Sequence, residues 1–201
     1  MADLTDVANE LVNQIASAAY PNGITQPSIG NCPILVYQGW PNPAELQADL
    51  PAGKVHISVF PRPGDKITSV MMGDSEWKVL SSDGTTGVSI REVRRQTRTF
   101  QITIWASCFD RRDPIASVID ASLAINSRLV MPDGSQGIMS YVNSAQDDSL
   151  QKQGIYRRDL FYAVNYATTQ TQDGFVIKST QTNASIGPTP DVQGPTITIT
   201  T

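Results

Sequence analysis

The sequence predicts an α+β fold: a single compact domain in which two main helices pack on a mostly antiparallel sheet, with a long hairpin and an extended C-terminal arm. Three stretches carry this prediction. Apolar and polar residues alternate over 99–109 and again over 156–167, as in half-buried strands, and an apolar stripe at helical spacing follows the first of them. With 201 residues, 40% of them hydrophobic, the chain can bury one sizeable core.

The N-terminal part predicts a helix and a short strand. Apolar residues recur at helical spacing over 4–19, with Asp3 or Thr5 as the candidate cap. A loop rich in Pro, Gly and Asn follows. Residues 34–37 are then typical of a short strand.

A short helix and a second strand come next. Asn42 can cap a helix, and Pro43 suits the first helical position because its missing N–H needs no partner there, so a helix is predicted over 43–49. Residues 55–60 alternate as a strand. We expect the Pro-Arg-Pro-Gly run at 61–64 to force the chain out of the sheet.

A long hairpin is predicted before and within the central strand. A strand at 77–80 and a turn at 82–84 precede a strand that resumes at 87–93. The central strand then covers 99–109, and its apolar side is formed by Phe100, Ile102, Ile104, Ala106 and Cys108.

The second main helix is predicted directly after the central strand. Asp113 can cap it and Pro114 suits its first position. An apolar stripe at helical spacing follows, and a turn at 131–134 ends it. The stripe consists of Ile115, Val118, Ile119, Leu123, Ile125 and Leu129.

Two strands and a polar tail complete the chain. Strands are predicted at 137–143 and 156–167, with a polar loop over 144–154. We therefore expect a core domain over 1–168 and an arm over 169–201, which holds few charges and many Thr and cannot build its own core. The end of the arm alternates as a short strand that could add to the edge of a sheet, the alternative being a disordered terminus; the residues are Thr196, Ile197, Thr198, Ile199 and Thr200.

Composition argues against several classes of protein. A net charge of −4 does not suit a protein that holds nucleic acid through its overall charge. No apolar run approaches the ~18 residues of a membrane span. The chain has only two cysteines, Cys32 and Cys108, which argues against a fold held together by disulfides. The acidic start, unlike a secretion signal, predicts synthesis and assembly in a cytoplasm.

The search for chemistry predicts no catalytic, cofactor-binding or metal-binding residues. One His and two distant Cys do not make a zinc site. His56 lies within a strand, where a hydrogen-bonded structural histidine is the favoured interpretation over a catalytic one. Asp147 and Asp148 could bind a hard cation, although a solvated pair is the more common case. We therefore expect a protein that is not an enzyme.

Clustered arginines are the most informative charges in this acidic chain. Pairing with carboxylates of the same or an adjacent subunit is favoured over phosphate contact, because no aromatic or basic stripe accompanies them. The predicted subunit-interface residues are Arg91, Arg94, Arg95, Arg98, Arg111, Arg112, Arg157 and Arg158.

The order of these elements resembles the small α/β proteins that terminate bacteriophage tails and join them to heads. The likeness lies in the first helix, in the strand over 98–105, in the helix after Asp113 and Pro114, and in the Arg-aromatic-Val-Tyr texture of the last strand over 156–166. It covers residues 1–168.

This resemblance implies a structural virion protein without catalytic residues. Related proteins form hexameric rings that cap the tail tube and contact the neck or portal connector. The implied partners are copies of the chain and neighbouring tube and neck proteins, with DNA passing unbound through an acidic lumen. The extended segment 61–86 and the Thr-rich arm depart from a minimal terminator. Another virion ring component, such as a head-completion adaptor or a baseplate protein, is therefore an alternative. A small hydrolase is a weaker alternative.

Overall fold

The computed structural model describes residues 3–69, 76–80, 86–175, 180–181 and 198–199. These contain three α-helices, α1 (Leu4–Ala19), α2 (Pro43–Asp49) and α3 (Phe109–Ile125), and a short 3₁₀ helix, η1 (Gln151–Gln153). The strands are β1 (Ile34–Gln38), β2 (Val55–Ser69), β3 (Glu76–Leu80), β4 (Thr86–Ala106), β5 (Arg128–Val130), β6 (Gln136–Asp147), β7 (Tyr156–Phe175), β8 (Thr180–Gln181) and β9 (Thr198–Ile199).

Seven strands form one mostly antiparallel sheet. Their order is β1-β2-β4-β7-β6-β5, and β3 pairs with the outer part of β4. Only β1 and β2 run parallel among these pairs. The predicted α+β domain is confirmed, with α2 as a third helix on the sheet.

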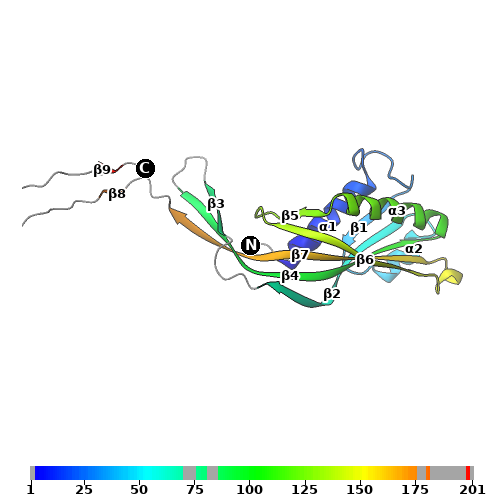
Figure 1. Cartoon of the computed structure of the whole chain (residues 1–201). Coiled ribbons are helices and arrows are strands. Elements are labelled where there is room, and N and C mark those ends of the chain that lie inside the picture. The colour runs from blue at the N-terminus through cyan, green and yellow to red at the C-terminus, as the bar shows by residue number, and fades with distance from the viewer. Residues whose placement is uncertain (1–2, 70–75, 81–85, 176–179, 182–197, 200–201) are drawn as a thin grey trace, which may run out of the picture.

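The pairing of β4 with β7 is the backbone of the sheet. It joins twenty residue pairs, from Thr86 opposite Phe175 to Ala106 opposite Tyr156, with one irregularity between Glu92 and Arg94. Beyond the helices, the ends of β4 and β7 project from the body together with β3 as a narrow ribbon (Figure 1). We call β3, residues 86–95 of β4 and residues 167–175 of β7 the ribbon.

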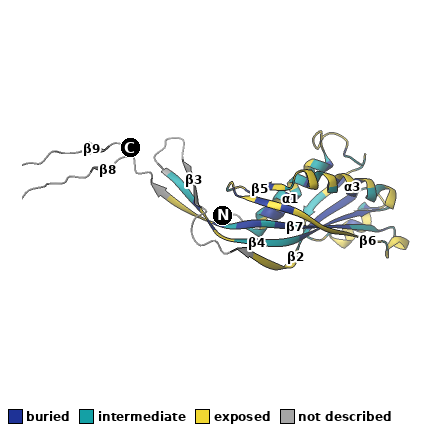
Figure 2. Cartoon of the chain, in the orientation of Figure 1, coloured by how far each residue is buried: buried dark blue, intermediate teal, exposed yellow. Residues whose placement is uncertain are grey.

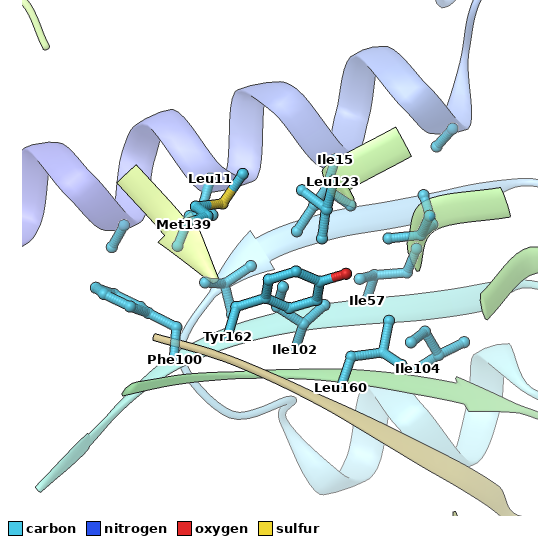
Figure 3. Packing of buried hydrophobic residues seen from close by; sticks show 14 of the residues in the cluster. Leu11, Ile15, Ile57, Phe100, Ile102, Ile104, Leu123, Met139, Leu160 and Tyr162 are labelled. Atoms are coloured by element: carbon cyan, nitrogen blue, oxygen red, sulfur yellow. The ribbon is translucent and has the colours of Figure 1, made fainter. Parts of the chain in front are cut away.

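The core lies between the sheet and helices α1 and α3. Figure 3 shows side chains of both helices meeting those of the central strands. Among the members with no exposed surface are Leu11, Ile15, Phe100, Ile102, Ile104, Leu123 and Leu160. In Figure 2 the buried residues gather in the body. Burying each such side chain contributes about 1.5–3 kcal/mol, so this layer supplies most of the driving force for folding.

Local signals define the first two helices. The Asp3 carboxylate accepts hydrogen bonds from the backbone N–H groups of Thr5 and Asp6, and Asp6 accepts one from Asp3 N in return. The Asn42 side chain accepts a hydrogen bond from Ala44 N at the start of α2. The predicted ranges 4–19 and 43–49 are both confirmed.

The expectation that residues 61–64 leave the sheet is wrong. β2 continues to Ser69, with a shift in register between Pro61 and Asp65. Proline is tolerated here because β1 pairs only as far as Val59, so this part of β2 is an edge strand.

The predicted limits of the second main helix are also wrong. α3 begins at Phe109, so Pro114 lies inside it, and the Asp113 carboxylate pairs with arginines instead of capping. Cys108 is the cap residue beyond the end of β4, and both cysteines are free. The helix ends at Ile125, which is 81% exposed, because residues 128–130 pair with β6 as β5.

The last two strands are longer than predicted. β6 reaches Asp147, through the first part of the expected loop, and β7 reaches Phe175 because β4 offers partners along its whole length. The strand at 77–80 is confirmed as β3. The strand predicted at 87–93 and the central strand as far as Ala106 are one strand, β4, whereas the predicted end at 107–109 is wrong because α3 begins at Phe109. The turn at 82–84, like Thr196, Ile197 and Thr200 of the arm, lies outside the described residues.

Replacing Ile102 with Ala should lower the free energy of unfolding by about 2–5 kcal/mol, because it leaves a cavity at a fully buried position. Urea unfolding followed by circular dichroism measures this loss. The matched control is Val93→Ala on the same strand, where the side chain is 48% exposed and the change should stay within about 0.5 kcal/mol. Equal losses at the two positions would contradict the layer arrangement.

Candidate assembly surface

The structure divides the eight predicted arginines between the two ends of the β4–β7 pairing. Arg91, Arg94, Arg95 and Arg98 lie on the ribbon or at its base. The other four lie at the start of α3 and the start of β7, which are adjacent because Ala106 pairs with Tyr156; they are Arg111, Arg112, Arg157 and Arg158.

Arg112 is the centre of the body group. Its side chain is only 2% exposed, and its Nε lies 2.8 Å from Asp113 Oδ1. Its Nη1 donates to the Asp148 carboxylate and, at 3.3 Å, to the carbonyl oxygen of Arg157. Arg158 Nη1 lies 3.6 Å from the same Asp113 oxygen. Arg112 therefore ties the first turns of α3 to the loop after β6 and to β7.

Arg157 is held on the opposite face of the sheet from α1 and α3. Its guanidinium carbon lies 5.5 Å from the ring centre of Trp40 and 5.2 Å from that of Trp105. Its Nη2 is 2.8 Å from the Asp159 carboxylate. An arginine that lies over two neighbouring indoles and is paired with a buried acid is a structural element of this face.

The ribbon group contains both paired and exposed members. Arg95 donates to both carboxylate oxygens of Glu92, at 2.9 and 3.0 Å, and Arg98 Nη1 lies 2.7 Å from Asp65 Oδ1. Arg91 and Arg94 are exposed. Arg94 directly follows Val93, and Arg91 precedes it by two residues. The irregularity in register leaves Val93 without a partner on β7, so the ribbon presents an exposed apolar side chain close in sequence to two cations.

His56 is a structural residue. It is 3% exposed, and its two ring nitrogens are both occupied, Nδ1 by the Tyr37 hydroxyl at 3.0 Å and Nε2 by Asp49 Oδ2 at 3.1 Å. Burial, with the negative charges of Glu45 and Asp49, raises the pKa of Tyr37 to about 12. The predicted hydrogen-bonded histidine is confirmed, and neither ring nitrogen is free to accept a proton from a nucleophile.

The described residues hold no group of three or more His, Cys, Asp or Glu side chains placed to bind a metal ion. Asp148 pairs with Arg112, and Asp147 accepts a hydrogen bond from Ser149 N at 3.0 Å. None of the helices in the described part of the chain is long and apolar enough to cross a membrane.

Sequence reasoning missed a polar network on the face opposite α1 and α3. Arg62 Nη1 donates to Gln101, whose amide donates to Thr103, which in turn donates to Asp159 at 2.7 Å. Arg62 also lies over the Phe161 ring, beside a shallow groove of about 360 Å³. The polar side of the alternating central strand was the signal for this network, since Gln101 and Thr103 are spaced two apart.

Sequence reasoning also missed the open edge of β6, which extends along the whole of residues 140–147. β7 pairs with the inner side of β6 as far as Asp147, whereas β5 pairs with its outer side only over residues 136–138. All residues from Ser140 to Asp147 are exposed.

Neither a protein-family model nor a curated protein matches this sequence. The fold is similar to a solved structure described as the sheath/tube terminator of an extracellular contractile injection system, PVC, in its extended state, with a TM-score of 0.50 and 12% identity. The chain has a terminator-like fold. The match covers 96% of this chain and 66% of the other, so the chain spans about two thirds of that terminator's length.

A second solved structure, from the virion of a native gene transfer agent particle, matches with a TM-score of 0.46 and 12% identity over 81% of this chain and 98% of the other. At such identities only the fold is comparable. The resemblance stated from the sequence is thus confirmed at the level of the terminator-like fold.

Replacing Arg112 with Ala should lower the free energy of unfolding by about 2–3 kcal/mol, because it leaves two carboxylates without their buried partner. The loss is not larger because water reaches both carboxylates and screens their charge. The exposed Arg94→Ala is the matched control and should change the free energy of unfolding by at most about 0.5 kcal/mol. Urea unfolding of both variants provides the comparison. A neutral Arg112→Ala would show that the buried cluster does not stabilise the fold.

The same cluster predicts a pH dependence. The hydrogen bond from Arg112, with its charge and that of Arg158, lowers the pKa of Asp113 below 3.8. The stabilisation from this carboxylate is therefore present above about pH 3.8 and lost as the pH falls through its lower folded value. The stability difference between the native chain and Asp113→Asn should be larger at pH 7 than at pH 2.5; a constant difference would rule out this linkage.

Proposed function

We propose that this chain is a structural component of a phage-like tail, a terminator whose copies form a ring, of six subunits, on the end of the tail tube. The terminator-like fold carries this proposal. The ring would join the tube to the neck or portal connector, and the assembled protein would belong to the virion after assembly in the cytoplasm of the host.

The mechanism proposed is geometric and involves no catalysis. The long β4–β7 pairing makes the body and the ribbon one continuous element, so a contact made by the ribbon is held at a defined angle to the body. A ribbon that projects from one subunit and contacts the body of the next is a head-to-tail contact, and such contacts close into rings.

Within the predicted interface, the arginines divide into two roles. Arg95, Arg98, Arg112, Arg157 and Arg158 pair with carboxylates of their own chain, and Arg111 donates to the Gly53 carbonyl at 2.9 Å. They would shape the subunit. The exposed Arg91 and Arg94, beside Val93, would contact the acidic surface of a neighbour.

The overall negative charge supports passive passage of DNA through the ring, since an acidic lumen repels the phosphate backbone. Cofactors and metals have no part in this function.

The mass of the full-length chain in solution tests the ring. Native mass spectrometry should show a closed oligomer of six chain masses, either alone or in the presence of purified tail tube, and electron microscopy should show it on tube ends. A folded monomer that does not bind the tube would overturn the proposal. A ring that binds only head or baseplate proteins would favour the alternative, another virion component.

Reversing both exposed ribbon charges, Arg91→Glu with Arg94→Glu, should shift the oligomer toward monomer by at least tenfold in the assembly constant, because two attractive contacts become repulsive. The matched control is Arg128→Glu with Lys152→Glu, which reverses two exposed charges away from the ribbon. Equal shifts in both double variants would show that the ribbon arginines hold no specific contact.

A further inference from the structure

Two stretches of the sheet edge differ in how they are protected, namely β2 beyond the end of β1 and β6 beyond the end of β5. The part of β2 that runs beyond β1 carries Pro61, Arg62, Pro63 and Lys66, and these residue types block pairing with another strand. The open edge of β6 carries none of them. Its sequence from 140 to 147, Ser-Tyr-Val-Asn-Ser-Ala-Gln-Asp, has no Pro, Lys or Arg and a single charge at its end.

This edge of eight residues has one irregularity in register, between Tyr141 and Asn143, and otherwise exposes a row of backbone donors and acceptors. Isolated chains usually protect such edges. This edge also offers side-chain contacts for an added strand. Tyr141 is 53% and Val142 49% exposed, on neighbouring positions of the strand. The edge therefore has both the backbone groups and the apolar surface that strand addition uses.

The C-terminal segment has the chemistry that suits this edge. Residues 196–200 alternate Thr and Ile without a charge, as expected of an added strand with one apolar and one polar side. In the structure β9 (Thr198–Ile199) pairs only with β8, through two residue pairs, and with none of the described strands of the main sheet. Two pairs are too few for a stable sheet, so exchange for a longer partner would be favourable.

The direction of the chain indicates whose edge would be used. β7 carries the chain out of its own body along the ribbon, and β8 and β9 lie beyond the end of β7 (Figure 1). The 23 residue steps from Phe175 to Thr198 can span up to about 75 Å when extended. That reach exceeds the diameter of a small domain, which is about 30 Å.

We propose that residues 196–200 of one copy add as a strand to the outer edge of β6, at residues 140–147, of a neighbouring copy. The neighbour is supplied by the ring of the proposed function, on which this inference rests. The added strand would satisfy backbone groups along β6, and Ile197 and Ile199 would pack beside Tyr141 or Val142. The arm would thereby link adjacent subunits without any contact by the ribbon arginines.

Isotope-resolved cross-linking of the full-length chain tests this pairing. A Ser144→Cys, Thr198→Cys double variant is prepared with natural isotopes and with ¹⁵N, mixed before assembly and treated with a short bismaleimide. We expect cross-links between positions 144 and 198 that join one isotope to the other, at least tenfold more than in the matched control with Ser117→Cys in place of Ser144→Cys. Ser117 is exposed on α3, away from the edge.

A yield equal to the control overturns the inference, and cross-links only within one isotope overturn the assignment to a second copy. Proline at both Ile197 and Ile199 should also speed amide hydrogen exchange over 140–147 at least tenfold, whereas Val at both positions should not. A ring of normal mass with control-level cross-linking would refute the arm pairing and leave the terminator function standing; a chain that never assembles would refute both.

Discussion

The long pairing of β4 with β7 is the constraint on which the rest of the structure depends. Each strand supplies the other with backbone partners from the body to the tip of the ribbon. Because buried backbone groups must be paired, neither strand can end earlier without leaving such groups unsatisfied. β2 pairs with β4 and β6 pairs with β7, and α3 packs on both of these central strands.

The two faces of that central pair are stabilised by different interactions. On the face of α1 and α3, side chains such as Ile102 and Leu160 have no exposed surface and contribute through burial. On the other face, Gln101, Thr103 and Asp159 are nearly as buried but are polar, and they satisfy one another through hydrogen bonds. A buried polar network of this kind is acceptable only when its members are all paired, which makes this face sensitive to single substitutions.

The proposed assembly role rests on exposed groups that the described fold does not use internally. In the body, Arg112, Arg157 and Arg158 pair with carboxylates of their own chain, and Arg112 is the most buried of them. The groups that matter for the proposals are two exposed cations on the ribbon and the open stretch of β6. These are suited to binding other protein chains, the first by charge and the second by backbone pairing.

The sequence by itself determined the local elements. The caps at Asp3 and Asn42 and the alternation around Ile102 depend on neighbours along the chain, so the first two helices and the apolar side of the central strand could be predicted from residue types. The likeness to tail terminators in the order of elements was visible for the same reason.

Only the tertiary structure decided where strands end and what the charges do. Proline at 61 was expected to break β2, but a strand edge tolerates it; Asp113 was expected to cap α3, but Arg112 and Arg158 take its carboxylate. Arg112 is a neighbour of Asp113 in sequence, but Arg158 is far away, and the tolerance of Pro61 depends on which strand is outermost. Long-range pairing therefore overrode local preference, and it alone left the outer edge of β6 open.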